Sequence, residues 1–477
     1  MEQSSARRRT KIVATLGPAT SSPEKIAALV AAGVDVVRLN FSHGEREQHR
    51  GTIRLVREVA AKAGREIGVL QDLGGPKIRL GQLPEEGVEL LREERVLLAA
   101  GSQYEDGALP VSYPYLAEDV APGDPILLAD GLVELRVIER REATVVCEVV
   151  VGGDVTSHKG INLPGTRLRV PAFTDKDRLD LEVGLDEGVD FVALSFVRSE
   201  HDLDPVLQRL SKAPVRPMLI AKIEKPQAVE RLEEILEQVD GVMVARGDLG
   251  VEVPVEQVPL IQKRIIHAAV SRAKPVITAT QMLRSMVDNP RPTRAEASDV
   301  ANAVLDGTDA VMLSEETAVG AYPVEAVRIL DRVARAVEPA LDHDGFLARL
   351  KQPPLRRTDE AIGHAACWLA RDIGATAIVA STISGTTARL VARFRPAAPV
   401  VGLTPHRAVE RQLTLSWGVL PGHVKAFAGT DAMFELAREW ALEHHLAAAG
   451  DRIILTAGVP INEPGTTNVL RVLEVEG

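Results

Sequence analysis

Short apolar segments alternate with amphipathic helical segments between Lys11 and Ala336, and this alternation limits the possible folds more than any other feature of the sequence. Strand–helix–strand repeats are typical of parallel strands joined by right-handed crossovers. The expected strands are at residues 11–17, 34–40, 67–72, 190–195, 218–224, 241–246, 275–280 and 309–314. The expected helices are at 23–32, 45–63, 175–187, 202–210, 228–239, 257–273, 293–305 and 323–336. Eight βα units in one run predict a TIM (β/α)8 barrel.

The repeat is interrupted once and is followed by a further domain. Helical periodicity disappears at residues 74–171, where β-branched runs at 125–129, 131–138 and 143–151 are separated by Gly-containing turns. This pattern predicts a small inserted β domain. After residue 340 a helix is expected at 358–373, with strands at 377–380, 399–403, 452–456 and 468–475. The predicted α/β protein therefore has a barrel (1–73 and 172–340), an insertion (74–171) and a C-terminal α/β domain (341–477).

Composition excludes several classes of function. The net charge of -11 argues against nucleic acid or an anionic membrane as the main partner. Cys147 and Cys367 lie far apart in apolar runs, which is typical of buried thiols and not of a disulfide framework or a zinc site. No apolar window is long enough to cross a bilayer, so we expect a soluble, cytoplasmic protein.

Nearly every expected barrel strand ends in a polar side chain. A single charged strand end only marks where a strand meets solvent, but the carboxyl ends of barrel strands share one face, and that face carries the active site. We therefore expect these side chains to form one site: Thr15, Arg38, Asn40, Asp72, Ser195, Lys222, Glu224, Arg246, Asp248, Thr280, Ser314 and Glu316.

The residue types at this face indicate a class of chemistry. Glu224 and Asp248 provide hard oxygen ligands of the kind that Mg²⁺ or Mn²⁺ prefers. Arg38, Arg79 and Lys222 provide positive charge, while Gly247 and Gly250 let backbone N–H groups approach an anion. This combination favours phosphoryl transfer, in which positioning and charge neutralisation supply most of the catalysis. The sequence has no Walker A motif and no kinase Gly-rich loop, so nucleotide binding must be of another kind.

Five segments resemble the signature motifs of the pyruvate kinase family. They read DVVRLNFSHG (35–44), KIE (222–224), VMVARGDLG (242–250), ATQML (279–283) and VMLSEETA (311–318). The resemblance extends from Lys11 to Val475 and includes the order of three domains. It implies transfer of a phosphoryl group from phosphoenolpyruvate to ADP, giving pyruvate and ATP in the final step of glycolysis. It also implies a homotetramer, and a β-barrel lid formed by the insertion that closes over the site and excludes water.

The resemblance also implies a role for each matching residue. Lys222 would stabilise the phosphoryl group in flight, and Glu224 and Asp248 would bind Mg²⁺ or Mn²⁺. Arg38 would contact the phosphate, while the backbone at Gly247 and Asp248, with Thr280, would hold the substrate carboxylate. The nucleotide contacts would be Arg79 and Lys159, with Asn40, Ser42 and His43 in a nearby loop. Thr280, Ser314 and Glu316 would hold the water chain that protonates the enolate.

Two positions depart from the family pattern. Members that need K⁺ carry Glu in the segment after the third strand, where this chain reads DLGGPK (72–77) and places Lys77. A fixed ammonium can replace the monovalent ion, so we expect activity without K⁺. Asn40, Ser42, Asp72 and the Leu73 carbonyl would then be either a former monovalent-cation site or partners of Lys77. The second departure is Glu315, where many relatives have a small residue, and the sequence alone does not explain it.

Hydroxyl residues and a glycine precede an expected helix in the C-terminal domain. The segment contains Ser381, Thr382, Ser384, Gly385, Thr386 and Thr387. Such a segment is either an ordinary N-cap with a tight turn or a cradle for a phosphate group. The resemblance favours an allosteric site for a phosphorylated effector. The loop at 457–467 lacks the basic and Trp residues of relatives that respond to fructose bisphosphate, so the identity of the effector stays open.

Two other functions are compatible with parts of the sequence. A Mg²⁺-dependent lyase or aldolase acting on a 2-oxo acid would share the barrel and the metal pair, but would need neither a lid nor Arg79 and Lys159. A catalytically silent paralogue that only binds an effector would not need the set Arg38, Lys222, Glu224, Asp248 and Thr280.

Overall fold

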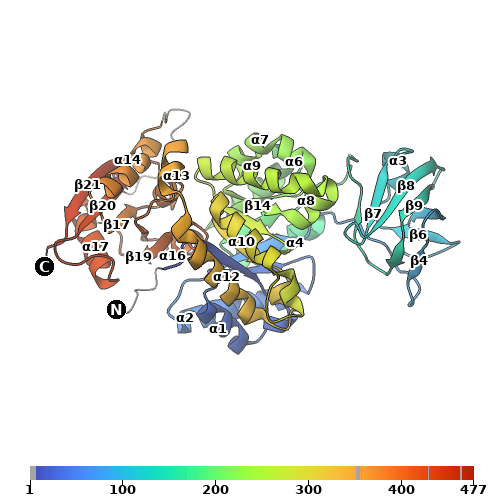
Figure 1. The fold of residues 1–477 in the computed structure, drawn as a ribbon, viewed down its shortest axis with the longest axis horizontal. Helices are drawn as coiled ribbons and strands as arrows, with labels where there is room; N and C mark the ends of the chain where they lie inside the picture. Colours follow the sequence, from blue (N-terminus) through green and yellow to red (C-terminus); the bar gives the residue numbers. More distant parts are fainter. Residues whose placement is uncertain are drawn as a thin grey trace.

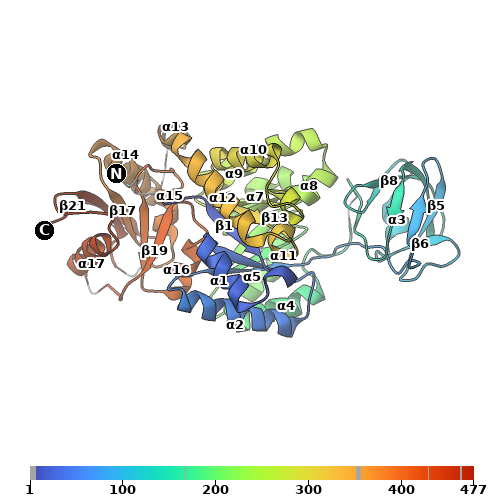
Figure 2. The same ribbon diagram turned by 60° about the horizontal axis from the view of Figure 1, so that its bottom comes forward.

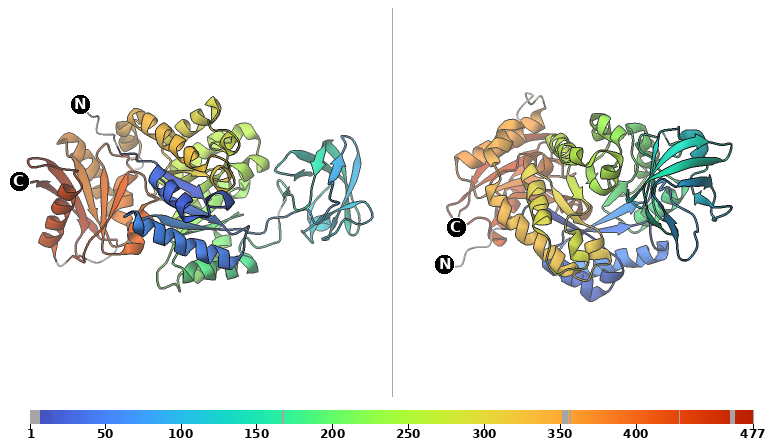
Figure 3. Two further views of the ribbon diagram at one scale, coloured as in Figure 1. Left: turned by 90° about the horizontal axis from the view of Figure 1, so that it is seen from below. Right: turned by 45° about the vertical axis from the view of Figure 1, so that its right-hand side comes forward.

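The barrel lies in the middle of an elongated molecule, with the inserted domain on one side and the C-terminal domain on the other (Figure 1). The computed structural model describes residues 7–166, 168–350, 355, 357–427, 429–461 and 465–476. Two chain segments connect the inserted domain to the barrel, and the barrel stays between the other two parts when the molecule is turned (Figures 2 and 3). No described helix is both long and apolar enough to span a membrane.

Eight parallel strands close into the barrel, as the alternation predicted. They are β1 (Lys11–Thr15), β2 (Val36–Asn40), β3 (Gly68–Leu73), β12 (Phe191–Leu194), β13 (Met218–Ile223), β14 (Gly241–Ala245), β15 (Val276–Ala279) and β16 (Ala310–Leu313). Almost every strand residue is buried, which explains why these segments are nearly continuous apolar runs. β16 pairs with β1 and completes the ring.

Helices cover the outside of the barrel near the predicted positions. They are α1 (Pro23–Ala32), α2 (Arg46–Lys62), α4 (Asp175–Asp186), α5 (Asp204–Leu210), α6 (Pro226–Glu230), α7 (Leu232–Gln238), α9 (Val258–Ser271), α10 (Arg294–Asp306) and α12 (Pro323–Val337). Ser22 caps α1 by accepting a hydrogen bond from the Lys25 N–H, and Gly33 ends it with φ of 112°.

The structure corrects the helix prediction at four places. The expected helix at 228–239 is two helices, because the backbone leaves the helical region at Arg231 (φ -101°, ψ 27°). The segment expected as a helix at 202–210 starts as a 3-10 turn at Glu200–Leu203. Two short helices, α8 (Arg246–Glu252) and α11 (Glu315–Ala318), directly follow β14 and β16 where loops were expected. These two helices orient Asp248 and Glu316.

An aspartate precedes every second strand at the amino end of the barrel. In each case the carboxylate accepts a hydrogen bond from the first free backbone N–H of the neighbouring strand, a donor that would otherwise be buried without a partner. The four bonds join Asp35 to Ile12 (2.8 Å), Asp190 to Val69 (2.8 Å), Asp240 to Leu219 (2.8 Å) and Asp309 to Val276 (3.1 Å). Four equivalent caps therefore stabilise the face opposite the predicted site.

The inserted domain is a mainly antiparallel β structure around its own apolar core, in which only the pairing of β5 with β6 is parallel among the described strands. Its larger sheet has the order β11 (Ile161–Asn162), β7 (Pro125–Leu128), β8 (Val133–Arg140), β9 (Thr144–Val151), β5 (Arg95–Ala100) and β6 (Ala108–Val111). Single bridges from Arg79 to Gly160 and from Leu80 to Val111 connect the two edges of this sheet and close it. β4 (Val88–Leu90) and β10 (Gly153–Val155) form a separate pair, and α3 spans Leu116–Asp119.

The C-terminal domain contains one five-stranded sheet with helices packed against it. The order is β19 (Val419–His423), β18 (Val400–Thr404), β17 (Ala377–Ser381), β20 (Arg452–Gly458) and β21 (Thr467–Glu474), with β21 antiparallel. The helices are α13 (His343–Arg349), α14 (Thr358–Asp372), α15 (Thr386–Ala392), α16 (Arg407–Leu413) and α17 (Thr430–Glu443). The prediction missed β19, α13, α16 and α17. β19 contains Pro421 and Gly422, which are turn residues that an edge strand tolerates.

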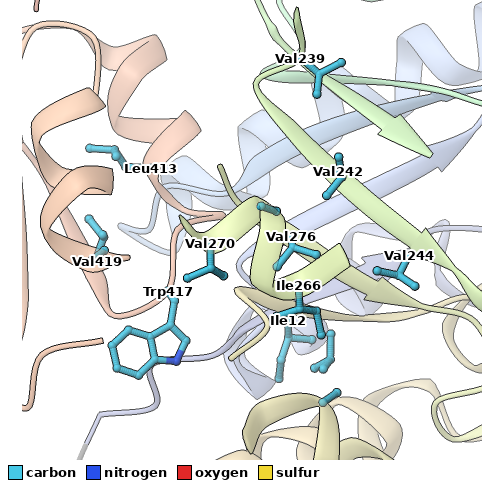
Figure 4. Packing of buried hydrophobic residues seen from close by; sticks show 14 of the residues in the cluster. Ile12, Val239, Val242, Val244, Ile266, Val270, Val276, Leu413, Trp417 and Val419 are labelled. Atoms are coloured by element: carbon cyan, nitrogen blue, oxygen red, sulfur yellow. The ribbon is translucent and has the colours of Figure 1, made fainter. Parts of the chain in front are cut away.

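The C-terminal domain packs against the amino end of the barrel. Leu413, Trp417 and Val419 belong to the same buried apolar cluster as Val270 and Val276 of the barrel domain (Figure 4). Asp309 joins the two parts: it accepts hydrogen bonds from the Trp417 N–H (3.0 Å) and from the Arg395 guanidinium (3.0 Å). This interface therefore lies at the end of the barrel opposite the polar strand ends.

We expect Asp309→Ala to lower the free energy of unfolding by ~3–5 kcal/mol, because it leaves the buried Arg395 guanidinium without its carboxylate. Glu66→Ala is the control. It removes a more exposed ion pair with Arg407 (3.4 Å) across the same interface, and such pairs contribute about 0–1 kcal/mol. Thermal and urea unfolding measure both variants. Equal effects of the two changes would contradict the role assigned to Asp309.

Candidate active site

The Lys222 ammonium lies at the centre of the polar strand ends. β13 carries it to the carboxyl end of the barrel, where Nζ is 2.7 Å from Glu224 Oε1, 3.5 Å from Asp72 Oδ1 and within hydrogen-bond distance (2.8 Å) of Ser195 Oγ. Burial lowers the pKa of Lys222, but the carboxylates of Asp72, Glu224 and Asp248 outweigh burial and raise that pKa above its ordinary value. The amine is therefore a permanent, buried cation.

Glu224 is fully buried beside Lys222. Its Oε2 accepts a hydrogen bond from the Phe196 N–H (2.9 Å), and Phe196 adopts a φ of 59° there. Burial raises the pKa of Glu224, and the nearby Asp248 carboxylate raises it further. A buried carboxylate whose charge is disfavoured in this way is stabilised when a divalent cation binds beside it.

The donor set fits Mg²⁺ or Mn²⁺ shared with a substrate. No group of three or more acid, His or Cys side chains able to hold a metal occurs among the residues that the structure describes. Mg²⁺ commonly binds to only one or two carboxylates and takes its other oxygen ligands from water and substrate phosphates. Glu224 and Asp248 match this pattern.

Arg38 and Asp72 form a second buried pair next to the first. Arg38 Nε lies 2.7 Å from Asp72 Oδ2, and Nη1 donates to Thr15 Oγ1 (3.0 Å). Burial raises the pKa of Asp72, but Lys222 and Arg38 together outweigh burial and hold that pKa below its usual range. Asp72 thus stays ionised and fixes two cations on one side of the site.

α8 and Thr280 form the opposite wall. The Gly247 N–H donates to Thr280 Oγ1 (2.6 Å), and Thr280 has a φ of 70°. Arg246 was expected among the polar side chains of the site, but it instead holds Thr280 in place. Its guanidinium donates to the Thr280 carbonyl (2.8 Å) and pairs with Asp299 (2.7 Å). The structure therefore brings Gly247, Asp248 and Thr280 together but assigns Arg246 to their support.

Ser314 and Glu316 follow β16, next to Thr280, which follows the neighbouring strand β15. Both carboxylate oxygens of the buried Glu316 accept backbone hydrogen bonds, one from the Leu283 N–H (3.0 Å) and one from the Ser314 N–H (2.7 Å). Glu316 therefore joins the loop after β15 to the loop after β16. Glu315, which the sequence left unexplained, forms a partly exposed ion pair with Arg284 (2.8 Å).

The predicted nucleotide residues lie where the barrel meets the inserted domain. Arg79 Nη1 donates to the His158 carbonyl (3.0 Å), next to the exposed Lys159. Lys77 packs against Gly160, where an added Cβ would come within 3.1 Å of Lys77 Cε. Burial lowers the pKa of His43, and Arg79, Lys77, Arg38 and Lys176 lower it further, so several cations surround the loop that carries His43.

The residues expected to form a monovalent-cation site, or to be partners of Lys77, are neighbours in the structure. β2 and β3 place Asn40 opposite Asp72, and Asn40 Oδ1 accepts a hydrogen bond from the Ser42 N–H (3.1 Å). The Leu73 carbonyl accepts a hydrogen bond from Ser195 (2.8 Å). In the described part of the chain, Lys77 forms no ion pair with Asp72, whose carboxylate is paired with Arg38 and Lys222.

Sequence reasoning missed some residues that shape this site. Lys176 donates to the Phe41 carbonyl (2.6 Å) and pairs with Asp180 (2.5 Å) on its own helix, which fixes the loop after β2. Glu252, at the end of α8, accepts hydrogen bonds from Lys225 and Asn162. Lys225 directly follows Glu224 in sequence, and this adjacency could have indicated that Lys225 lies near the site. The other contacts join segments far apart in the chain, and no local pattern reveals them.

The hydroxyl segment of the C-terminal domain lines a pocket against β20 and β21. Thr387 Oγ1 lies 2.7 Å from Thr467 Oγ1, and Ser384 Oγ lies 2.9 Å from Thr386 Oγ1. Gly385 adopts a φ of 80°. α15 begins at Thr386 and ends at Ala392. Residues 462–464 of the adjoining loop lie outside the described residues.

Comparisons with known proteins agree over nearly the whole chain. A family model described as pyruvate kinase, barrel domain, matches residues 7–327, and one described as pyruvate kinase, alpha/beta domain, matches residues 360–473. The chain is 44% identical over 470 residues to a pyruvate kinase of Geobacillus stearothermophilus, covering 98% of this chain and 80% of that protein. It is 43% identical over 471 residues to a pyruvate kinase of Clostridium acetobutylicum, covering 98% of this chain and 100% of that protein.

A solved structure has the same fold. The crystal structure of a pyruvate kinase from Cryptosporidium parvum superposes with a TM-score of 0.94 at 34% sequence identity, covering 100% of this chain and 98% of that one. The agreement includes the barrel, the insertion and the C-terminal domain.

Proposed function

The chain belongs to the pyruvate kinase family and is a phosphotransferase, and from this premise we propose how its residues transfer a phosphoryl group from phosphoenolpyruvate to ADP. One observation carries the proposal. The buried Lys222 ammonium lies between Asp72 and Glu224 at the carboxyl end of the barrel, within the electrostatic influence of Asp248. A fixed cation beside the two proposed metal ligands, Glu224 and Asp248, can stabilise the anionic phosphoryl group during its transfer.

The substrate would be held by groups from opposite walls of the site. Arg38 and Lys222 bind the phosphate, while the backbone N–H groups at Gly247 and Asp248 and the Thr280 hydroxyl bind the carboxylate. When bound, Mg²⁺ or Mn²⁺ held by Glu224 and Asp248 neutralises charge on the substrate oxygens. Because Asp72 keeps Arg38 and Lys222 in place before substrate arrives, little reorganisation is needed during transfer.

Phosphoryl transfer breaks the bond between phosphorus and the enol oxygen and forms a bond to a terminal oxygen of ADP. Arg79 and Lys159 bind the ADP phosphates from the side of the inserted domain. That domain excludes water, which is the competing acceptor. The enolate then takes a proton at its methylene carbon from a water held by Thr280 and Ser314. Glu316 positions Ser314 directly, by accepting its backbone N–H, and ties it to the loop after β15 by accepting the Leu283 N–H.

A coupled assay tests this function. Pyruvate formation from phosphoenolpyruvate, followed with lactate dehydrogenase and NADH, should require ADP and a divalent cation, and ATP should form in equal amount. Pyruvate formation that needs no ADP would support a lyase instead, and absence of turnover would support a silent binding protein.

We further propose that K⁺ is not required, because the Lys77 ammonium supplies positive charge beside the loop of Asn40, Ser42 and His43. In buffer with a tetraalkylammonium salt, adding K⁺ should change the wild-type kcat less than about twofold.

Lys77→Glu should make the enzyme depend on K⁺. The new carboxylate would repel the anionic ADP, and two like charges about 4 Å apart interact by ~4 kcal/mol in a partly shielded site. We therefore expect kcat to fall tenfold or more without K⁺ and to recover when K⁺ is added. Lys77→Met removes the ammonium without adding a negative charge, so it controls for the added charge and should lose less activity without K⁺ than Lys77→Glu. Strong activation of the wild-type enzyme by K⁺ would contradict the proposal.

We also propose that the pocket lined by Ser381, Thr382, Ser384, Thr386 and Thr387, with Gly385 at the adjoining start of α15, binds a phosphorylated effector. The buried Ser381 hydroxyl has no hydrogen-bond partner among the described residues, which is consistent with a missing ligand. Repeating the coupled assay with sugar phosphates and AMP tests this site. A cytoplasmic homotetramer remains the proposed state of the protein, on the basis of the family.

A further inference from the structure

The buried carboxylate of Glu252 joins three segments of the chain at the C-terminal end of α8. Glu252 is the last residue of α8, and its Oε1 accepts hydrogen bonds from Lys225 Nζ (2.6 Å) and from Asn162 Nδ2 (3.0 Å). Lys225 follows β13, and Asn162 belongs to β11 of the inserted domain. All three residues are buried, with exposed fractions of 7–9%.

Each of the three segments carries a residue of the proposed mechanism. Glu224 directly precedes Lys225, and Asp248 lies in the first turn of the helix that Glu252 ends. Lys159 lies three residues before Asn162 and is fixed to the same strand region by the bond from the Leu80 N–H to the Lys159 carbonyl (2.8 Å). Glu252 therefore connects both proposed metal ligands to the proposed nucleotide lysine.

Stability alone does not account for this arrangement. A buried Lys–Glu pair loses about as much free energy by desolvation as it gains by attraction, and an apolar pair of similar size is commonly as stable. The inserted domain also has its own core and a separate attachment, in which Arg198 donates to the Leu168 carbonyl (2.7 Å) and the Val170 carbonyl (3.2 Å). What only the carboxylate provides is an acceptor for both Lys225 and Asn162.

We propose that Glu252 is a positioning residue that couples the placement of the inserted domain to the metal-binding acids. The bond from Asn162 holds β11 against α8 and so sets the position of Lys159 relative to Asp248. The inference rests on the proposed roles of Lys159, Glu224 and Asp248. Its consequence is that loss of this bond weakens nucleotide binding while leaving the phosphoenolpyruvate contacts, which come only from the barrel, in place.

The test compares Asn162→Ala with the double variant Lys225→Met/Glu252→Leu. Asn162→Ala removes only the bond from the inserted domain. The double variant replaces the buried ion pair with an apolar pair, so the fold is retained while Asn162 loses its acceptor. Each is expected to raise the KM for ADP about tenfold, since a hydrogen bond to a charged group accounts for a change of that size. The KM for phosphoenolpyruvate and the thermal unfolding temperature of Asn162→Ala should change little.

The triple variant decides whether Asn162 acts through Glu252. If it does, Asn162→Ala in the Lys225→Met/Glu252→Leu background should not raise the KM for ADP further. Gln82→Ala is the control, because it removes a side-chain amide whose bond to the Leu83 carbonyl (3.2 Å) stays within the inserted domain. An unchanged KM for ADP in Asn162→Ala, or a further tenfold rise in the triple variant, would overturn the proposal. Lys159→Ala tests the proposed nucleotide site separately. If this variant leaves the KM for ADP unchanged, the role proposed for Lys159 is wrong, and the Asn162 comparison can still be interpreted.

Discussion

Lys222→Met is expected to lower kcat by about 10³-fold or more while the KM for phosphoenolpyruvate changes much less. Removing a fixed cation or donor from a developing anion typically costs 10²–10⁵ in kcat. Lys222 is the cation that both Asp72 and Glu224 contact, so no neighbouring amine takes over its role. Arg38, the other nearby cation, is held by Asp72 and Thr15. Single-turnover measurements of ATP formation report the change directly.

The same substitution should also affect stability, and the effect should depend on the divalent cation. Without Lys222, Glu224 keeps one backbone hydrogen bond but loses its counter-charge, and breaking a buried pair in this way costs ~3–5 kcal/mol. Mg²⁺ or Mn²⁺ should restore part of the loss, because the cation neutralises the same carboxylate. Thermal unfolding with EDTA and with Mg²⁺ measures the difference.

Lys11→Met is the matched control for this experiment. Lys11 is also a buried barrel lysine, but it lies at the amino end, where Nζ donates to the Val419 carbonyl (2.8 Å) and burial lowers its pKa. Its removal should alter stability and leave kcat within about twofold of wild type, since it is remote from the site of transfer. Similar losses of kcat in Lys11→Met and Lys222→Met would contradict a direct role for Lys222.

Glu224→Gln and Asp248→Asn are each expected to raise the Mg²⁺ activation constant by about 100-fold or more, because each removes a charged ligand from a site with only two protein ligands. Asp309→Asn is the control, since it neutralises a buried barrel acid at the opposite end. It should leave the metal constant unchanged. An activation constant that is unaffected by both site variants would contradict the assigned metal ligands.

The raised pKa of Glu224 gives this prediction a pH dependence. A buried carboxyl with a raised pKa binds its proton at a higher pH than a free one, and the proton competes with the metal. The Mg²⁺ activation constant of the wild-type enzyme should therefore rise as the pH falls toward the pKa of Glu224. In Glu224→Gln this part of the pH dependence should disappear.

The sequence predicted the barrel and the shared face of its polar strand ends because both depend on local patterns. Lys222 and Glu224 are two residues apart at the end of one strand, so they lie on the same side and were expected to act together. Asp248 was expected near them because the carboxyl ends of parallel strands share one face. The apolar runs and the spacing of the motifs were sufficient for these conclusions.

The remaining features depend on contacts between segments far apart in sequence. Arg246 looked like a rim residue, but its partners are the Thr280 carbonyl and Asp299, and only the fold brings these together. Glu316 looked like a proton-transfer residue, yet both oxygens accept backbone hydrogen bonds from two loops. The role inferred for Glu252 likewise depends on a bond to Asn162, which lies in another domain.

The most direct test of this account is the position of Mn²⁺ in crystals soaked with Mn²⁺ and phosphoenolpyruvate, determined from anomalous scattering. We expect one strong peak about 2.1 Å from carboxylate oxygens of both Glu224 and Asp248, with the substrate phosphate between that peak and the Lys222 ammonium. A peak coordinated by Asp72 instead, or a phosphate bound away from Lys222, would contradict the central claim.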